Sequence, residues 1–150
     1  MDETRRDKAA RLFGDGCNCA QAVLCAYADV LGLDEELAAK LAFPFGGGMG
    51  RLREVCGAVS AMLMVLGLTE GCDLAAAATP AMLDGYARVR ALAGSDREAH
   101  GSILCRELLE RIQQDPPQVP LKADGQPQRP CIVYVLGAVD LIEREISPRA

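Results

Sequence analysis

Four cysteines of this chain lie where helix ends would favour the ionised, reactive form of sulfur. They are Cys19, Cys56, Cys105 and Cys131. Each lies beside or inside a different predicted helix, and all but Cys105 fall at or near the expected helix N-terminus. Because a helix start carries partial positive charge from its peptide dipoles and unpaired N–H groups, it stabilises a thiolate over a thiol. This placement indicates sulfur redox chemistry or metal ligation.

The spacing of these cysteines leaves both chemistries open. Their separations of 37, 49 and 26 residues contain none of the short paired spacings that identify a zinc site, and the ferredoxin spacings are also absent. Four thiolates from separate helices can still hold zinc or an iron–sulfur cluster, and they can equally exchange disulfides. The candidate catalytic thiols and the candidate metal ligands are therefore the same residues: Cys19, Cys56, Cys105 and Cys131.

The other cysteines have a simpler interpretation. The chain has seven in total, so at least one stays unpaired in any intramolecular scheme. A free cysteine packs as a small hydrophobic side chain, which predicts a core or loop role for Cys17, Cys25 and Cys72. Cys105 is expected in the middle of a helix beside Leu108 and Leu109, where it would act as a resolving partner or a buried ligand.

A glycine-rich loop lies shortly before Cys56. If it leads into a helix, the first N–H groups of that helix can meet an anion, with arginines adding positive charge. The candidate cofactor-binding residues are Gly46, Gly47, Gly48, Gly50 and Arg51. The loop lacks both a preceding strand and the Lys-Ser/Thr pair of a nucleotide-binding loop. The alternative is a tight turn that lets Cys56 approach other backbone closely.

The elements that must position these residues are predicted to be helices. Only 4% of the residues are aromatic and there is no Trp, while Ala and Leu abound, which favours helices over a sandwich or barrel. We expect an all-α bundle of six or seven helices, in one domain over residues 1–150. The expected helices are Asp2–Phe13, Asn18–Leu31, Asp34–Ala42, Leu52–Leu66, Pro80–Ala93, a sixth opened by a capping box at Ser95–Glu98 that carries Cys105, and Cys131–Ile146.

Two segments complete this outline. Five of the eight prolines lie between Gln114 and Pro130, a composition typical of a long loop, and we expect this loop to cover the cysteine site. The only histidine, His100, is predicted to lie on the surface and away from Cys105.

Charge and hydropathy restrict the partners. The net charge of −5 opposes binding to nucleic acid or to an anionic membrane. The N-terminus lacks the apolar core of a secretory signal, and the longest weakly polar run is too short to span a bilayer, so a cytoplasmic protein without membrane insertion is expected. A hydrophobic content of 50% and a mean hydropathy of +0.09 are high for such a short chain and suggest a homo-oligomer, such as a homodimer.

Several strings together resemble a known family. They are Gly16-Cys17-Asn18-Cys19-Ala20-Gln21-Ala22-Val23-Leu24, Phe45-Gly46-Gly47-Gly48-Met49-Gly50-Arg51, Glu54-Val55-Cys56-Gly57-Ala58-Val59-Ser60, Cys105-Arg106-Glu107-Leu108-Leu109 and Pro130-Cys131. In order and spacing they resemble the C_GCAxxG_C_C family of redox-active proteins. Two features depart from that pattern: Ala61 stands where members often have glycine, and the chain has three additional cysteines.

The resemblance implies a small protein with four signature cysteines and a redox role, without naming a substrate or an electron partner. It places the signature at Cys19, Cys56, Cys105 and Cys131. Three hypotheses follow from the sequence as a whole. The protein is a thiol redox protein, in one form a thiol oxidoreductase; or it binds an iron–sulfur cluster or a metal such as zinc through the same cysteines; or it is a non-enzymatic helical binding or adaptor module with structural cysteines.

Overall fold

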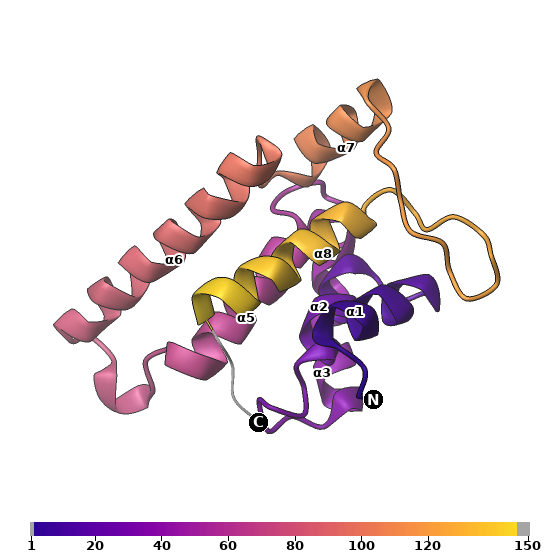
Figure 1. Ribbon diagram of the computed structural model, residues 1–150. Helices are drawn as coiled ribbons and strands as arrows, with labels where there is room; N and C mark the ends of the chain where they lie inside the picture. The colour runs from indigo at the N-terminus through magenta and orange to yellow at the C-terminus, as the bar shows by residue number, and fades with distance from the viewer. Residues whose placement is uncertain (1, 147–150) are drawn as a thin grey trace.

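The computed structural model describes residues 2–146, and the regular secondary structure in this range is almost entirely helical (Figure 1). Within that range β structure is limited to two isolated bridges, Val55 with Leu104 and Leu121 with Pro127. The all-α prediction is therefore confirmed. The α-helices are α1 (Arg5–Gly14), α2 (Cys19–Ala26), α3 (Glu35–Ala42), α4 (Gly46–Met49), α5 (Gly57–Glu70), α6 (Pro80–His100), α7 (Cys105–Gln114) and α8 (Ile132–Leu141); two 3-10 turns, η1 (Phe43–Phe45) and η2 (Leu74–Ala76), and a π-helical turn, η3 (Ile142–Ile146), complete them.

Side-chain caps fix the starts of the first three helices. Thr4 accepts a hydrogen bond from the backbone of α1, and Asp34 accepts one from the backbone of α3. At α2, Asn18 and Gln21 each bond the other's backbone N–H, which forms a capping box. Because such caps satisfy N–H groups that have no partner within the helix, they hold each start at one residue. For α2 that residue is Cys19.

The core is centred on α2, α5 and α8. Helices α5 and α8 are apolar around most of their circumference, as expected for buried elements, and each has seven buried residues. Helix α2 packs most extensively against α5 and α1. Figure 1 shows α5 and α8 running side by side through the middle of the molecule, with α6 along one flank. The three core helices all begin at or next to a cysteine.

Helix α5 starts five residues later than predicted. Instead of continuing as a helix from Leu52, the chain has positive φ angles at Arg51 and Arg53 and then pairs Val55 with Leu104 in an isolated bridge. This pairing draws the segment into extended backbone, which a helix cannot accommodate. The prediction was therefore wrong about the start, and Cys56 is the N-cap of α5 rather than a first-turn residue.

The boundary between α6 and α7 also differs from the prediction. The Ser95–Glu98 segment does not open a helix but lies inside α6, where the Ser95 hydroxyl donates back to the carbonyl of Ala91. Helix α6 ends at Gly101, whose left-handed φ of 87° is a common helix terminator. A new helix then begins at Cys105. Cys105 is therefore at a helix start and not in the middle of a helix.

The proline-rich segment packs against α1. Gln128 donates to the carbonyl of Ala10, and Arg129 donates to the carbonyls of Phe13 and Cys17 while its guanidinium lies 3.8 Å above the Phe13 ring. These hydrogen bonds hold the segment that directly precedes α8 in place. The segment contributes no residue to the lining of the cysteine cavity described below, so the expectation that it covers the site is not supported.

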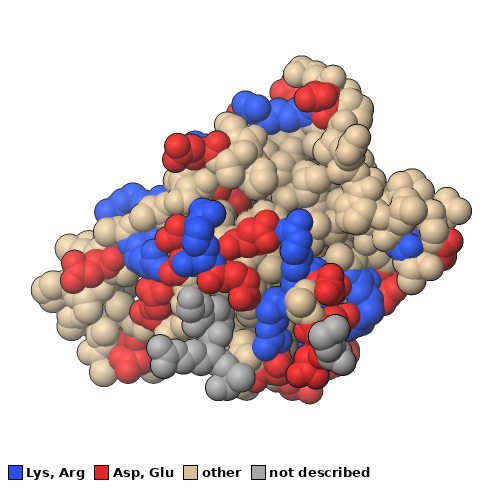
Figure 2. All heavy atoms as spheres, in the orientation of Figure 1, with Lys and Arg blue, Asp and Glu red and all other residues tan. Residues whose placement is uncertain are grey.

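Positive and negative side chains are mixed on the face drawn in Figure 2, rather than gathered in an area of one sign. Ion pairs account for part of this mixing, among them Arg5 with Asp29 and Arg6 with Asp140. Within residues 2–146, no helix is both long enough and apolar enough to cross a membrane.

Candidate functional site

Four helix starts from distant parts of the sequence meet around one small cavity of about 60 Å³. Each of the four predicted cysteines stands at one of them: Cys19 is the first residue of α2, Cys56 the N-cap of α5, Cys105 the first residue of α7 and Cys131 the N-cap of α8. The cavity is lined by Cys19, Gly47, Arg53, Cys56, Gly57, Cys105, Leu108, Leu109, Cys131 and Tyr134. All four cysteines therefore stand at helix starts, including Cys105, which sequence reasoning placed in the middle of a helix.

The Cys19 sulfur is surrounded by hydrogen-bond donors. The Cys56 thiol donates to it, and so do the backbone N–H groups of Gly47, Ala20 and Gly57. These donors lower the pKa of Cys19 from 9.0 to about 6, with the Cys56 bond contributing most and burial opposing the shift. At neutral pH the Cys19 sulfur is therefore mainly a thiolate, the form that attacks disulfides and electrophiles.

Cys56 has the complementary role in this pair. Its thiol proton is held in the hydrogen bond to the Cys19 sulfur, and it is buried, with 6% of its surface exposed. The bond and then the burial raise the pKa of Cys56 well above its usual range. Two adjacent thiols, one ionised and one protonated, are the arrangement that a nucleophile and a resolving partner require.

Gly57 makes the close approach of these helices feasible. A Cβ atom at this position would lie 2.6 Å from the Cys19 Sγ and 2.6 Å from the carbonyl oxygen of Phe45. Neither distance is compatible with a real side chain, so only glycine permits this contact between the starts of α2 and α5.

The glycine loop is a left-handed turn that supports the cysteines. Gly47 and Gly48 both have φ of 68°, and a Cβ at Gly48 would lie 2.6 Å from the Cβ of Cys105. The backbone N–H groups of Arg53 and Glu54 return to the carbonyls of Gly47 and Gly48, which closes the turn. The turn therefore directs one amide at Cys19 and makes room for Cys105.

The predicted cofactor-binding residues do not act together. Among Gly46, Gly47, Gly48, Gly50 and Arg51, only Gly47 lines the cavity, and Arg51 is exposed. Gly46 is packed against the Asn18 side chain, where a Cβ would have no room. This geometry favours the tight-turn interpretation, and binding of an anionic cofactor by these five residues stays a prediction.

A short backbone pairing fixes Cys105 beside Cys56. The N–H of Cys56 donates to the carbonyl of Ile103 at 2.8 Å, and the N–H of Cys105 donates to the carbonyl of Glu54 at 2.6 Å. The Arg53 guanidinium donates to the Cys105 sulfur at 3.6 Å and provides a positive charge at the cavity wall. Cys105 is therefore held both by this backbone pairing and by a contact with a cation.

Cys131 completes the ring of sulfurs as a protonated thiol. Burial raises its pKa to about 11, and negative charge on Cys19 and Cys105 adds to the effect. Tyr134, one turn further along α8, forms part of the cavity wall and donates its hydroxyl to the carbonyl of Leu108. This bond ties α8 to α7, so the two helix starts that carry Cys105 and Cys131 are held together.

The remaining cysteines lie outside the cavity lining. Cys25 is buried inside α2, and burial raises its pKa to about 11. Burial also raises the pKa of the half-buried Cys17, whereas Cys72 is exposed beyond the end of α5. The site thus separates the four predicted cysteines from the other three.

The prediction that His100 lies on the surface was wrong. Its ring is half-buried between α6 and α8, stands edge-on to Tyr134 with 5.2 Å between ring centroids, and has a buried Nε2 3.9 Å from a carboxylate oxygen of Asp96. Gly137 of α8 provides the space, because a Cβ there would lie 2.4 Å from Nε2. His100 therefore packs against Tyr134, a residue of the cavity wall, without lining the cavity itself.

Sequence reasoning missed two residues of the site. Arg53 was noted only as an added charge near the glycine loop, and Tyr134 was not singled out. A signal existed for Tyr134, which lies three residues after Cys131 and hence on the same side of α8. For Arg53 no signal existed, because its position depends on the left-handed backbone of the turn.

Metal ligation gains no direct support from the arrangement. In the part of the chain that is described, no three His, Cys, Asp or Glu side chains are grouped so that they could hold a metal ion. The four sulfurs surround the cavity, but only Cys19 and Cys56 are joined by a hydrogen bond between side chains. The arrangement thus resembles a dithiol with two further thiols nearby.

Comparison with known protein families gives a match over most of the chain. The model of the C_GCAxxG_C_C family, described as a putative redox-active protein, matches residues 17–145. This chain belongs to the C_GCAxxG_C_C family. No curated protein and no solved structure matches it. The family assignment confirms the resemblance in the sequence, and the matched range includes all four cysteines of the cavity.

The departures from the family pattern do not touch the cavity. Ala61 lies one turn after Gly57 in α5 and is fully buried, so its methyl group is accommodated in the core. Of the three additional cysteines, Cys17 is the first matched residue, and neither Cys25 nor Cys72 lines the cavity. The departures noted in the sequence therefore lie outside the cavity lining.

Proposed function

We propose that this protein is a thiol redox protein in which Cys19 is the attacking thiolate and Cys56 the resolving thiol. The observation that carries the proposal is the hydrogen bond from the Cys56 thiol to the Cys19 sulfur, which also receives three backbone N–H groups. Such a pair is prepared for disulfide exchange, because nucleophilic attack needs a thiolate and resolution needs a second thiol within reach. The sequence suggested Cys105 as the resolving residue, but the thiol hydrogen-bonded to the Cys19 sulfur is that of Cys56.

The exchange proceeds in two steps, attack and resolution. The Cys19 thiolate attacks one sulfur of a substrate disulfide, forming a mixed disulfide and releasing one substrate thiolate. The Cys56 thiol then transfers its proton to that thiolate and attacks the Cys19 sulfur, forming the Cys19–Cys56 disulfide and releasing the second substrate thiolate. The substrate gains two electrons and the pair loses two. The reverse sequence oxidises a dithiol substrate.

Cys105 and Cys131 serve as the second pair in this proposal. They line the same cavity and stand at two helix starts tied together by Tyr134. In this proposal the Cys105 sulfur, which accepts a hydrogen bond from Arg53, attacks the Cys56 sulfur of the Cys19–Cys56 disulfide and releases Cys19 as a thiolate. The Cys131 thiol then attacks the Cys105 sulfur, forming the Cys105–Cys131 disulfide, and its proton passes to the departing Cys56 sulfur. Exchange within the cavity would carry a disulfide from one pair to the other without solvent exposure of Cys56.

A second candidate function is ligation of an iron–sulfur cluster. One observation favours it: four cysteines at four helix starts border a single cavity, and N–H groups directed at sulfur are a feature that tunes such clusters. The absence of any three grouped ligands among the described residues weighs against a single metal ion. We therefore rank this candidate below dithiol exchange.

The test compares thiol counts and metal content in protein purified without oxygen. Free thiols are counted before and after mild oxidation with a small disulfide, and disulfide-linked peptides are identified by mass spectrometry. The matched variants are Cys19→Ser and Cys56→Ser at the site, with Cys72→Ser as an exposed control. Visible absorption and elemental analysis on the same sample report iron and zinc.

Dithiol exchange predicts the reversible loss of two or four thiols, with Cys19 linked to Cys56 in the first product. Either site variant should stop intramolecular disulfide formation at this pair, while Cys72→Ser leaves it intact. Stoichiometric iron with visible charge-transfer bands would instead establish the cluster. Inert thiols without metal would overturn both and favour a helical binding or adaptor module with structural cysteines.

A further inference from the structure

The cysteine cavity is too small to enclose a substrate. Its volume of about 60 Å³ gives room for only a few water molecules, whereas pockets that enclose small ligands measure roughly 300–1,000 Å³. A thiol or disulfide that exchanges with these cysteines must therefore lie mostly outside the cavity and bring only its sulfur to the wall. The surface next to the cavity decides which molecules can do so.

A polar groove adjoins the cavity along α7. It has a volume of about 490 Å³ and is lined by Arg53, Arg106, Glu107, Leu109, Glu110 and Gln113. Arg53 and Leu109 also line the cavity, so these two side chains form the wall between the groove and the sulfurs. Leu109 lies one turn after Cys105 in α7, which places the Cys105 sulfur next to this wall.

Arg53 is available to a ligand. Its half-buried guanidinium donates to the Cys105 sulfur at 3.6 Å, and its Nη1 lies 3.6 Å from the position that a Cβ of Gly47 would occupy. Within residues 2–146 this guanidinium has no carboxylate partner. Because a guanidinium presents five N–H donors in a fork that fits a carboxylate, its position at the groove indicates a ligand with a carboxylate.

The other charges of the groove narrow the ligand further. Arg106 is paired with Glu54, and Glu107 accepts a hydrogen bond from the Ser102 hydroxyl. Glu110 is exposed and makes no ion pair with any residue that the structure describes. The groove therefore combines an unpaired guanidinium with an unpaired carboxylate, and an amino acid carries the two complementary groups.

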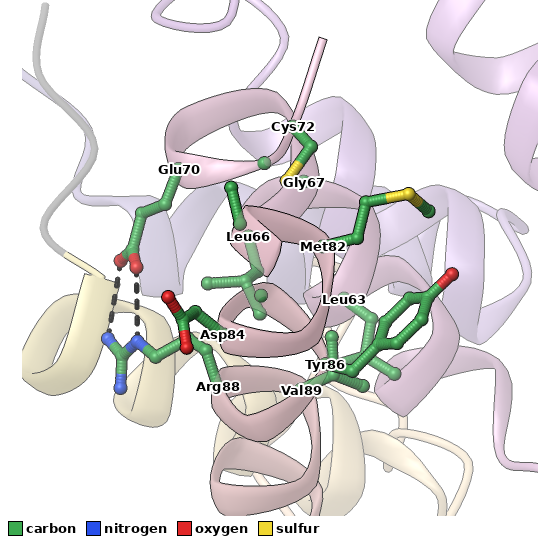
Figure 3. Close-up of a pocket in the computed structure, with 13 residues that line it drawn as sticks. Leu63, Leu66, Gly67, Glu70, Cys72, Met82, Asp84, Tyr86, Arg88 and Val89 are labelled. Carbon is green, nitrogen blue, oxygen red and sulfur yellow. Dashed lines mark hydrogen bonds and ion pairs between the residues drawn. The ribbon is translucent and has the colours of Figure 1, made fainter. Parts of the chain in front are cut away.

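The groove drawn in Figure 3 is a poorer candidate. It lies between α5 and α6, has a volume of about 610 Å³, and shares no lining residue with the cysteine cavity. Its arginine, Arg88, already donates two hydrogen bonds to Glu70, which are drawn as dashed lines. Its only lining thiol is the exposed Cys72. With an exposed thiol and a paired arginine, this groove provides a reference for the groove beside α7.

We propose that the groove beside α7 binds a small thiol of the amino-acid type, or its disulfide, and that Arg53 selects it by binding its carboxylate. The ammonium group of the ligand then faces Glu110, and its sulfur lies at Cys105. To bind the carboxylate, the long Arg53 side chain turns from the Cys105 sulfur toward the groove, which uncovers that sulfur. The role of the ligand in electron exchange rests on the thiol redox function proposed above, whereas its binding does not.

The ligand exchanges electrons with the second cysteine pair. When Cys105 and Cys131 form a disulfide, the thiolate of the bound ligand attacks the Cys105 sulfur, and Cys131 leaves. The thiolate of a second ligand molecule then attacks the ligand sulfur of this mixed disulfide and releases Cys105. The two ligand thiols lose two electrons and become a disulfide. Cys105 and Cys131 gain these electrons and take up the two protons that the ligand thiols have lost.

The first test uses the unaltered, reduced protein and compares alkylation by iodoacetate, which carries a carboxylate, with alkylation by uncharged iodoacetamide. Rates at each cysteine are followed by mass spectrometry of its peptide. The ratio of the iodoacetate rate to the iodoacetamide rate should be at least about tenfold higher at Cys105 than at Cys72. Arg53→Gln should abolish most of this preference. Arg111→Gln should preserve it, because Arg111 is exposed on α7 outside both linings.

The second test measures mixed disulfide formation at Cys105 in Cys131→Ser, in which Cys131 cannot resolve it. The probes are cystine, which carries both charged groups, dithiodiglycolate with carboxylates only, cystamine with ammonium groups only, and uncharged hydroxyethyl disulfide. Adding Arg53→Gln should slow the reaction of cystine and dithiodiglycolate at least about tenfold relative to hydroxyethyl disulfide. Adding Glu110→Gln should instead slow cystine and cystamine, by about two- to fivefold because Glu110 is exposed.

The outcomes separate selection by Arg53 from a general effect on the sulfur. An iodoacetate preference at Cys105 that is absent, or that survives Arg53→Gln, overturns the proposal. Equal slowing of all four disulfides in Arg53→Gln also overturns it, and so does a Cys105 sulfur that reacts with none of these reagents. Neither test depends on a disulfide between Cys19 and Cys56, so failure of this proposal is distinguishable from failure of the thiol redox function.

Discussion

The acidity of Cys19 should depend on Cys56. The Cys56 hydrogen bond is the largest cause of the pKa of about 6, a decrease of three units from 9.0. Three units correspond to about 4 kcal/mol in favour of the thiolate. A hydrogen bond to a charged group contributes about 1.5–3 kcal/mol of this, or roughly one to two units. Cys56→Ala should therefore raise the pKa of Cys19 to about 7–8.

The assay is the rate of iodoacetamide alkylation at Cys19 against pH, followed by mass spectrometry of its peptide in reduced protein. The wild-type rate should reach half its maximum at about pH 6, so that about nine-tenths of Cys19 is thiolate at pH 7. In Cys56→Ala this midpoint should move upward by at least one pH unit. The backbone N–H groups still present should keep it below the ordinary value.

Cys72→Ala is the matched control, because Cys72 is exposed and lies outside the cavity lining. It should leave the midpoint of Cys19 where it is. A wild-type midpoint near 9 would refute the proposed donors around the Cys19 sulfur. An unchanged midpoint in Cys56→Ala would refute the role of the Cys56 thiol while leaving the backbone donors in place.

Three other changes test the packing around the site and the buried charge behind it, each by denaturant unfolding. Gly57→Ala should lower the unfolding free energy by about 1–3 kcal/mol, because its methyl group has no room, whereas Gly67→Ala in the same helix has open space and should raise it by about 0.5–1 kcal/mol. Gly48→Ala should cost at least about 2 kcal/mol from its positive φ and its contacts, and equal stability of the two proteins would contradict the left-handed turn. Burial raises the pKa of Asp96 to about 6, above its unfolded value. The stability associated with the protonated carboxyl is therefore fully present below about pH 4 and is lost as the pH rises through 6. Asp96→Asn should therefore raise the unfolding free energy at pH 8 by up to about 3 kcal/mol and flatten its pH dependence; no change between pH 4 and 8 would contradict the burial argument.

The sequence predicted those parts of the fold that depend on local patterns. Composition and periodicity indicated helices, and the Asn18 cap placed Cys19 in the first turn of α2, as observed. The start of α8 was also placed correctly, next to Cys131. Caps and periodicity are encoded within a few residues, so one chain suffices to read them.

The failures share a physical cause, which is pairing between distant segments. Ser95–Glu98 has the composition of a capping box, yet packing keeps it inside α6, while the stronger break at Gly101 was overlooked. The start of α5 was misplaced because the extended backbone before Cys56 is held by Ile103, far away in the sequence. Which thiol bonds to Cys19 is decided by the same tertiary contacts, so the sequence left the pairing open.

The backbone pairing between Glu54 and Cys105 also constrains the order of folding. It closes a loop that contains all of α5 and α6. The chain loses the entropy of closing such a long loop before the contacts across it can form. The ring of four sulfurs is therefore completed only when α7 and α8 have docked. The donors to the Cys19 sulfur, by contrast, all lie between Ala20 and Gly57, so rapid alkylation of Cys19 at neutral pH would report that α2, the glycine turn and the start of α5 have already assembled.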